Sequence, residues 1–127
     1  YLDRVNNIID LAGFTRITKQ IMGDAIKLSK IGVEDWTACK EFGENKPYIN
    51  LYYENPNALS QKEIRSKIND EMMHIDTDYR DVHNMLGYDP LLLTEVPDGS
   101  FQKYIQTNKS SISRINPQRE ELGKLLG

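Results

Sequence analysis

The sequence has few of the features that commit a protein to disulfide, zinc or membrane roles. Its 127 residues include one cysteine, Cys39, which excludes an internal disulfide framework and a zinc site built from cysteines. No apolar run approaches the ~18 residues that a membrane span requires, so we expect no membrane anchor. The chain does not begin with Met, and no signal-peptide pattern follows Tyr1. We expect an excised or processed piece of a cytoplasmic protein.

The sequence also lacks a block of one charge. Its 16 basic and 19 acidic residues give a net charge of -3 and are mixed along the chain. A nucleic-acid surface needs clustered cations that neutralise a row of phosphates, and none is present. We therefore expect no nucleic-acid partner.

The signatures of a self-sufficient enzyme are missing as well. No two of the eight glycines lie within three residues of each other, although a phosphate-binding loop usually needs such a cluster. There is no G-x-S-x-G nucleophile elbow. His74, Asp76, Asp78 and His83 crowd together, but their spacing matches neither a zinc motif nor a calcium loop. We expect a solvated helix end there and no metal site.

The composition, with 39% hydrophobic residues, is sufficient for one core, and the patterns predict a single α+β domain. Residues 1–13 suggest two short strands that meet at Gly13. Apolar positions from Ile17 to Leu28 recur at helical spacing, with Thr18 as N-cap and a stop near Gly32.

Alternating and apolar segments predict the sheet. Residues 35–42 alternate in polarity, and residues 48–54 are rich in strand formers, so the two segments are expected to pair as an antiparallel hairpin. Residues 91–96 form an apolar segment bounded by prolines, which is typical of a buried strand. With the N-terminal strands, we expect a mixed or antiparallel sheet of about four strands with helices packed on it.

Further helices are expected in the second half of the chain. Ser60 and Glu63 form a capping box that begins a helix reaching about His74, and residues 76–86 continue as helix or turn. A short helix follows residue 98, with Asp98 or Ser100 as cap. Residues 108–119 have little apolar periodicity and predict an exposed loop before a last helical turn around Leu122 and Leu125.

The first residues of the chain carry a recognisable pattern. The segment LDRVNNIIDLAGF, followed by Arg16-Ile17, resembles the hinge of acyl- and aryl-adenylate-forming ligases. In that superfamily an acidic residue and an arginine lead from a large ATP-binding domain into a small mobile lid, followed by two apolar residues and a glycine turn. The residues that match this hinge are Asp3, Arg4, Asn6, Ile8, Ile9 and Gly13.

Later segments narrow the resemblance. Tyr52-Tyr53-Glu54, Asp78-Tyr79-Arg80 and the segment VPDGSF of residues 96–101 are similar to bacterial relatives of the auxin-responsive acyl-acid amido synthetases. The resemblance covers nearly the whole chain. It implies that residues 1–127 are a C-terminal lid domain, with hinge and first strands in 1–13 and a basic active-site loop in 108–119.

The resemblance also implies chemistry. Members of the family use ATP and Mg to activate a carboxylic acid as an acyl-adenylate, then pass the acyl group to an amine, often that of an amino acid. The lid rotates between these steps. The N-terminal adenylation domain of the same protein is therefore the expected partner, it would bind most of the ATP and Mg, and the lid alone would not be catalytic.

The closing loop supplies the candidate catalytic residues. The family has a lysine there, shortly before Pro-Arg, that reaches into the ATP site. This chain instead has Arg114 three residues before Pro117, and an extra residue on each side of the proline. Arg114 keeps the charge that stabilises an oxyanion, Lys109 is a second candidate and Arg119 a third. Without the resemblance each would be interpreted as an exposed cation.

Two other interpretations remain open. The chain can be the lid of a coenzyme A ligase of the phenylacetate type, which changes the acceptor but not the domain. It can also be an α+β binding or dimerisation module with no catalytic parent, recruited through its Tyr-rich hairpin.

Overall fold

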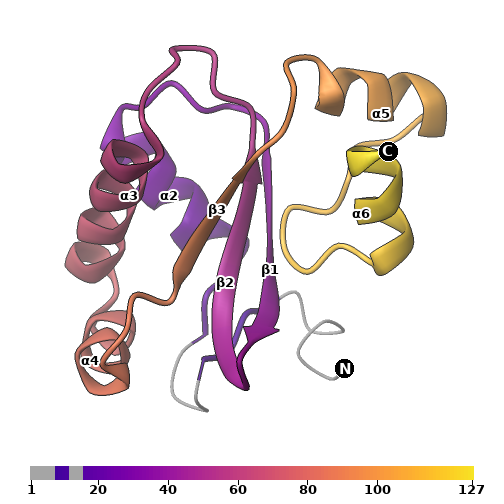
Figure 1. The fold of residues 1–127 in the computed structure, drawn as a ribbon. Coiled ribbons are helices and arrows are strands. Elements are labelled where there is room, and N and C mark those ends of the chain that lie inside the picture. Colours follow the sequence, from indigo (N-terminus) through magenta and orange to yellow (C-terminus); the bar gives the residue numbers. More distant parts are fainter. Residues whose placement is uncertain (1–7, 12–15) are drawn as a thin grey trace.

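The computed structural model describes residues 8–11 and 16–127 of the chain, and in these residues it contains five helices and three strands. In chain order the elements are α2 (Lys19–Ser29), β1 (Trp36–Gly43), β2 (Lys46–Tyr53), α3 (Gln61–Ile75), α4 (Thr77–Leu86), β3 (Leu91–Glu95), α5 (Ser100–Asn108) and α6 (Arg119–Leu126). Figure 1 shows the sheet between two sets of helices, α2, α3 and α4 on one side and α5 and α6 on the other. The α+β class is confirmed.

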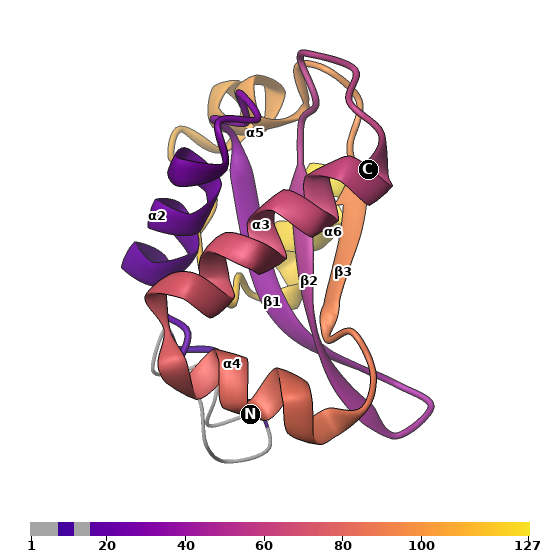
Figure 2. The same ribbon diagram turned by 90° about the vertical axis from the view of Figure 1, so that its left-hand side faces the viewer.

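The sheet is mixed, with strand order β1-β2-β3. β1 and β2 pair antiparallel from Trp36 opposite Tyr53 to Gly43 opposite Lys46, which confirms the predicted hairpin. β3 pairs with β2 in parallel, because α3 and α4 carry the chain back to the start of the sheet. Figure 2 shows these helices and α2 crossing in front of the sheet.

The described residues hold three strands, where we expected about four. In the N-terminal part an antiparallel bridge joins Ile9 and Ile17, with two hydrogen bonds of 2.9 Å. A single bridged pair is too short to make a strand. Residues 1–7, 12 and 13 of the two expected N-terminal strands lie outside the described part of the chain.

Local capping signals position the helices on the first side of the sheet. Thr18 and Ser60 accept hydrogen bonds from the amides of Ile21 and Glu63, as predicted. Asp76 caps α4, which ends at Gly87 with φ 75°. The end of α2 differs from the prediction, because Lys30 takes the left-handed conformation with φ 55° two residues before Gly32.

The sheet is buried on both faces, and two hydrophobic clusters fill the layers. The larger lies against α2, α3 and α4 and includes Ala38, Leu51 and Ile68, while the smaller lies against α5 and α6 and includes Cys39 and Phe101. The predicted alternation in β1 therefore separates the two clusters. Across the described residues, every helix is too short or too polar to span a lipid bilayer.

Candidate functional site

The segment before α6 lies along the free edge of β1. The amide of Ala38 donates to the carbonyl oxygen of Arg114 at 2.8 Å, and the amide of Asn116 donates to the carbonyl oxygen of Ala38 at 2.8 Å. The Thr37 hydroxyl donates to the carbonyl oxygen of Ser113 at 2.5 Å. A parallel bridge joins Ala38 and Ile115. The segment thus satisfies backbone groups that an edge strand leaves open.

The prediction of an exposed loop over 108–119 is confirmed only in part, because residues 109–111, 113, 118 and 119 are exposed and others are not. Ile112, Ile115, Asn116 and Pro117 are buried, since pairing with β1 turns these side chains toward the protein interior. The irregular segment is also shorter than predicted, because α5 includes Asn108 and α6 begins at Arg119.

Arg114 is half-buried and held in place. Its guanidinium donates to the carbonyl oxygens of Trp36 at 2.7 Å and Glu34 at 3.1 Å, and lies 5.0 Å from the centre of the Trp36 ring. Burial lowers the pKa of Arg114 from its usual value, and the nearby Asp35 carboxylate opposes the shift. A guanidinium has five N–H groups, and these bonds use two of them. Arg114 is a positioned cation with capacity to bind an anion.

A hollow of about 390 Å³ adjoins Arg114. It lies between the start of α2, the start of β1, α5 and the closing segment, and it is lined by Lys19, Asp35, Phe101, Ile105, Ser111, Ile112, Ser113 and Arg114. The pKa of Asp35 is raised, first by loss of hydration and then by the Glu54 carboxylate, while Arg114 acts in the opposite direction. The hollow therefore joins two cations, one carboxylate and an apolar wall.

Comparisons with known proteins give a likeness in fold to solved structures. No family model matches the chain, and no curated protein matches it. Among solved structures, the fold is similar to that of GH3.15 acyl acid amido synthetase, with a TM-score of 0.69 and 16% sequence identity. The alignment covers 94% of this chain and 25% of that chain. The chain has the fold of one part of an acyl acid amido synthetase.

The structure does not bring the three candidate cations, Arg114, Lys109 and Arg119, together. Lys109 is exposed and ends α5, where it takes φ 62°, and Arg119 is exposed at the start of α6. Neither residue lines the hollow beside Arg114. Lys19 lines it instead, and sequence reasoning missed it because no local pattern relates position 19 to position 114.

Most of the hinge predicted from the amido synthetase resemblance cannot be placed. Asp3, Arg4, Asn6 and Gly13 lie outside the described residues. Ile8, a described residue of the hinge pattern, contacts the closing segment, since the side-chain amide of Asn116 donates to the carbonyl oxygen of Ile8 at 2.9 Å.

Two of the residues grouped near the end of α3, Asp76 and His83, make local hydrogen bonds. The Asp76 carboxylate accepts from the amides of Asp78 and Tyr79, and His83 lies 3.4 Å from the side-chain amide of Asn69. In residues 8–11 and 16–127, no three His, Cys, Asp or Glu side chains gather as metal ligands would.

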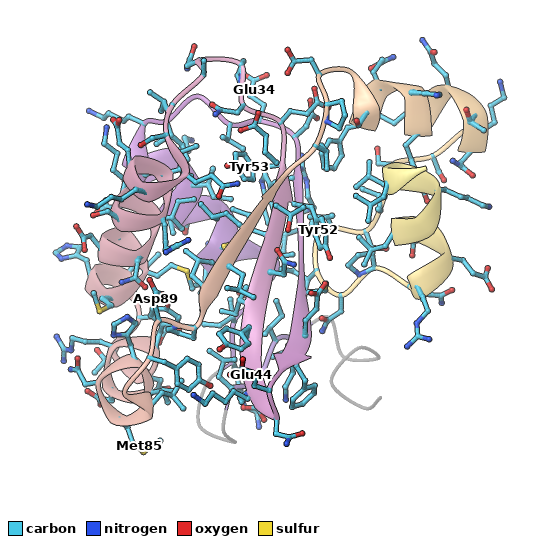
Figure 3. The ribbon with its side chains drawn as sticks, in the orientation of Figure 1. Glu34, Glu44, Tyr52, Tyr53, Met85 and Asp89 are labelled. Carbon is cyan, nitrogen blue, oxygen red and sulfur yellow. The ribbon has the colours of Figure 1, made fainter. Side chains whose placement is uncertain are left out.

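A polar network lies on the sheet face toward α5 and α6. The Glu41 carboxylate accepts hydrogen bonds from the Tyr52 hydroxyl and, at 3.0 Å, from the Asn50 amide. The Thr94 hydroxyl donates to Asn50 at 2.9 Å. Figure 3 shows Tyr52 on the α6 side of the sheet and its neighbour Tyr53 on the other. These polar groups satisfy one another, so the network links the three strands.

Proposed function

We propose that the chain is the mobile C-terminal lid of an ATP-dependent acyl-adenylate-forming ligase that joins a carboxylic acid to an amine or amino acid. The fold likeness to one part of GH3.15 acyl acid amido synthetase over 94% of this chain carries the proposal. The hinge-like pattern around Asp3 and Arg4 supports it independently. An adenylation domain of the same protein would bind most of the ATP and Mg.

The anchored Arg114 suits the first half-reaction. Formation of an acyl-adenylate releases pyrophosphate, so negative charge develops at the phosphate oxygens, and a preorganised cation stabilises it. Arg114 keeps its charge at any physiological pH, because even a lowered arginine pKa stays far above neutrality. It would act by electrostatics and hydrogen bonding, and it would not transfer a proton.

The hydrogen bonds that hold Arg114 also fix it to the body of the domain. Arg114 is tied to β1 through its own carbonyl oxygen and to the α2–β1 connection through its guanidinium. If the lid rotates, Arg114 moves with the sheet and not as an independent loop. Rotation would then present the charge for adenylation and withdraw it when the acceptor enters.

Acid-dependent exchange of labelled pyrophosphate into ATP, measured on the full-length protein, tests the proposal. We expect exchange with at least one carboxylic acid, and a mass-detected amide when amino acids are added. A thioester formed only with coenzyme A would replace the amido synthetase by a coenzyme A ligase with the same lid. An upstream reading frame without a Ser/Thr/Gly-rich phosphate loop, together with no exchange, would favour a binding or dimerisation module.

A further inference from the structure

Trp36 contacts Arg114 through both its backbone and its ring. The Trp36 carbonyl oxygen accepts from one terminal nitrogen of the guanidinium at 2.7 Å, and the ring centre lies 5.0 Å from the guanidinium carbon. The other terminal nitrogen donates to the carbonyl oxygen of Glu34 at 3.1 Å. The guanidinium is therefore held at its edge by two hydrogen bonds while it lies over the indole ring.

The Trp36 ring is itself fixed by packing. Trp36 is 6% exposed and belongs to the hydrophobic cluster against α2, α3 and α4. A Cβ atom added at Gly23 in α2 would lie 3.6 Å from Cζ2 of the ring, so the ring lies against that helix. Side chains in a close-packed interior keep one rotamer for most of the time. Arg114 thus lies over a rigid surface.

We infer that Trp36 is a positioning residue for Arg114, and that the site formed by its ring, its carbonyl oxygen and that of Glu34 accepts arginine but not lysine. A lysine at position 114 would place its nitrogen where the guanidinium carbon now lies, short of both carbonyl oxygens. Its ammonium is compact and strongly hydrated, whereas a guanidinium is planar and stacks on aromatic rings. A positive charge alone does not satisfy this site.

The inference rests on the proposed function in one respect, the use of Arg114 in formation of the acyl-adenylate. A donor stabilises the charge that develops in a transition state only when it is already in place. Loss of the ring would therefore slow this step although the charge of Arg114 is kept. Trp36 acts through Arg114 and does not itself touch the nucleotide.

Acid-dependent pyrophosphate exchange by the full-length protein tests the inference. Arg114→Lys should slow exchange at least ~10-fold although the charge is kept. Trp36→Leu removes the ring but not the carbonyl oxygen, and it should slow exchange ~10-fold, as loss of a desolvated cation–π contact does. Trp36→Phe should restore part of the rate. In an Arg114→Ala background, Trp36→Leu should cause no further loss, because the two residues act as one unit.

Tyr104→Leu is the matched control. Tyr104 is also 6% exposed, but it belongs to the cluster against α5 and α6 and does not line the hollow beside Arg114. It should lower the urea midpoint as Trp36→Leu does, and its exchange rate should stay close to that of the parent. If Trp36→Leu does not fold, Arg114→Lys and Trp36→Phe still decide the outcome.

Two results would overturn the inference. One is an Arg114→Lys protein that exchanges pyrophosphate as fast as the parent. The other is a Trp36→Leu change that slows exchange by the same factor in the parent and in the Arg114→Ala background, which is the result expected if Trp36 only stabilises the fold.

NMR of the 15N-labelled chain separates this inference from the proposed function. The Nε–H signal of Arg114 should carry a ring-current shift, which Trp36→Phe reduces and Trp36→Leu abolishes. An Arg114 signal that neither variant changes would refute positioning by Trp36, whether or not the full-length protein is active. Absence of pyrophosphate exchange with any acid would refute the proposed function and leave the NMR result as it stands.

Discussion

The side-chain amide of Asn116 joins the two ends of the domain, donating to the carbonyl oxygen of Ile8 at 2.9 Å while its Oδ1 accepts the amide of Lys40 at 3.1 Å. Asn116 is 5% exposed and has φ 50°, a conformation that asparagine tolerates better than most residues. One side chain thus connects Ile8 of the predicted hinge segment, the edge of β1 and the closing segment that carries Arg114.

Replacing Asn116 with glycine tests this connection, because glycine keeps the positive φ and removes only the side chain. We expect a loss of about 1–2 kcal/mol in the free energy of unfolding, since the partly buried amide of Lys40 and carbonyl oxygen of Ile8 each lose a hydrogen-bond partner. Urea denaturation measures the loss. Hydrogen exchange should quicken at the Lys40 amide, and unchanged protection there would contradict the connection.

Glu54 caps α5 from a distance. Gly99 occupies the N-cap without a side-chain bond, and the Glu54 carboxylate takes the amides of Gly99 and Phe101 instead. Glu54→Ala should lower the free energy of unfolding by about 1–2 kcal/mol, as loss of an ordinary N-cap does. Glu54→Gln should lower it less, because the side-chain amide keeps one acceptor oxygen. Equal urea midpoints for Glu54→Ala and the parent would show that water replaces the carboxylate without loss.

The β1–β2 turn is built from residues that suit it only in part. Glu44 and Asn45 have φ 52° and 66°, the two positive values of a type I′ turn, which Asn-Gly prefers. Figure 3 shows Glu44 at the outer end of the hairpin. The double change Glu44→Asn with Asn45→Gly should stabilise the protein by about 0.5–1 kcal/mol, seen as a higher melting temperature. Asn45→Val should lower the melting temperature. Equal melting temperatures for the double variant and Asn45→Val would contradict the turn assignment.

Asp35 predicts a pH effect of definite sign. Its pKa is raised in the folded protein, first by loss of hydration and then by Glu54, so the folded state holds the proton more tightly than the unfolded state. Stability is therefore reduced as pH rises from below the ordinary aspartate pKa to above the folded value. Asp35→Asn should remove this loss. The free energy of unfolding of the variant should therefore rise relative to that of the parent as the pH increases from acidic to neutral. A constant difference in unfolding free energy across that window would refute the sign.

Features set by neighbouring residues were predictable from sequence. Thr18 and Ser60 marked helix starts because an N-cap bonds within its own turn. The hairpin followed from alternation in β1 and strand-forming residues in β2. The face assignment of Ala38 and Cys39 also held, since the two helical layers cover opposite sides.

Features set by distant residues were not predictable. The cap on α5 joins positions 47 apart, and the bond from Arg114 to Trp36 joins positions 78 apart. The closing segment seemed exposed because its apolar residues, Ile112 and Ile115, are few and lack strand or helix periodicity. Its burial depends on the open edge of β1, which a sequence does not reveal. For the same reason the position of Lys19 beside the Arg114 hollow was not predicted.

The central claim, that Arg114 lends charge to a nucleotide held by the adenylation domain, is tested most directly by Arg114→Ala in the full-length protein. We predict that pyrophosphate exchange slows by roughly 100-fold, the usual cost of removing an oxyanion donor, while transfer from a preformed adenylate slows much less. Asn116→Gly loosens the same segment without removing charge, so its pyrophosphate exchange rate should remain closer to that of the parent. Equal exchange rates in Arg114→Ala and the parent would remove Arg114 from the mechanism.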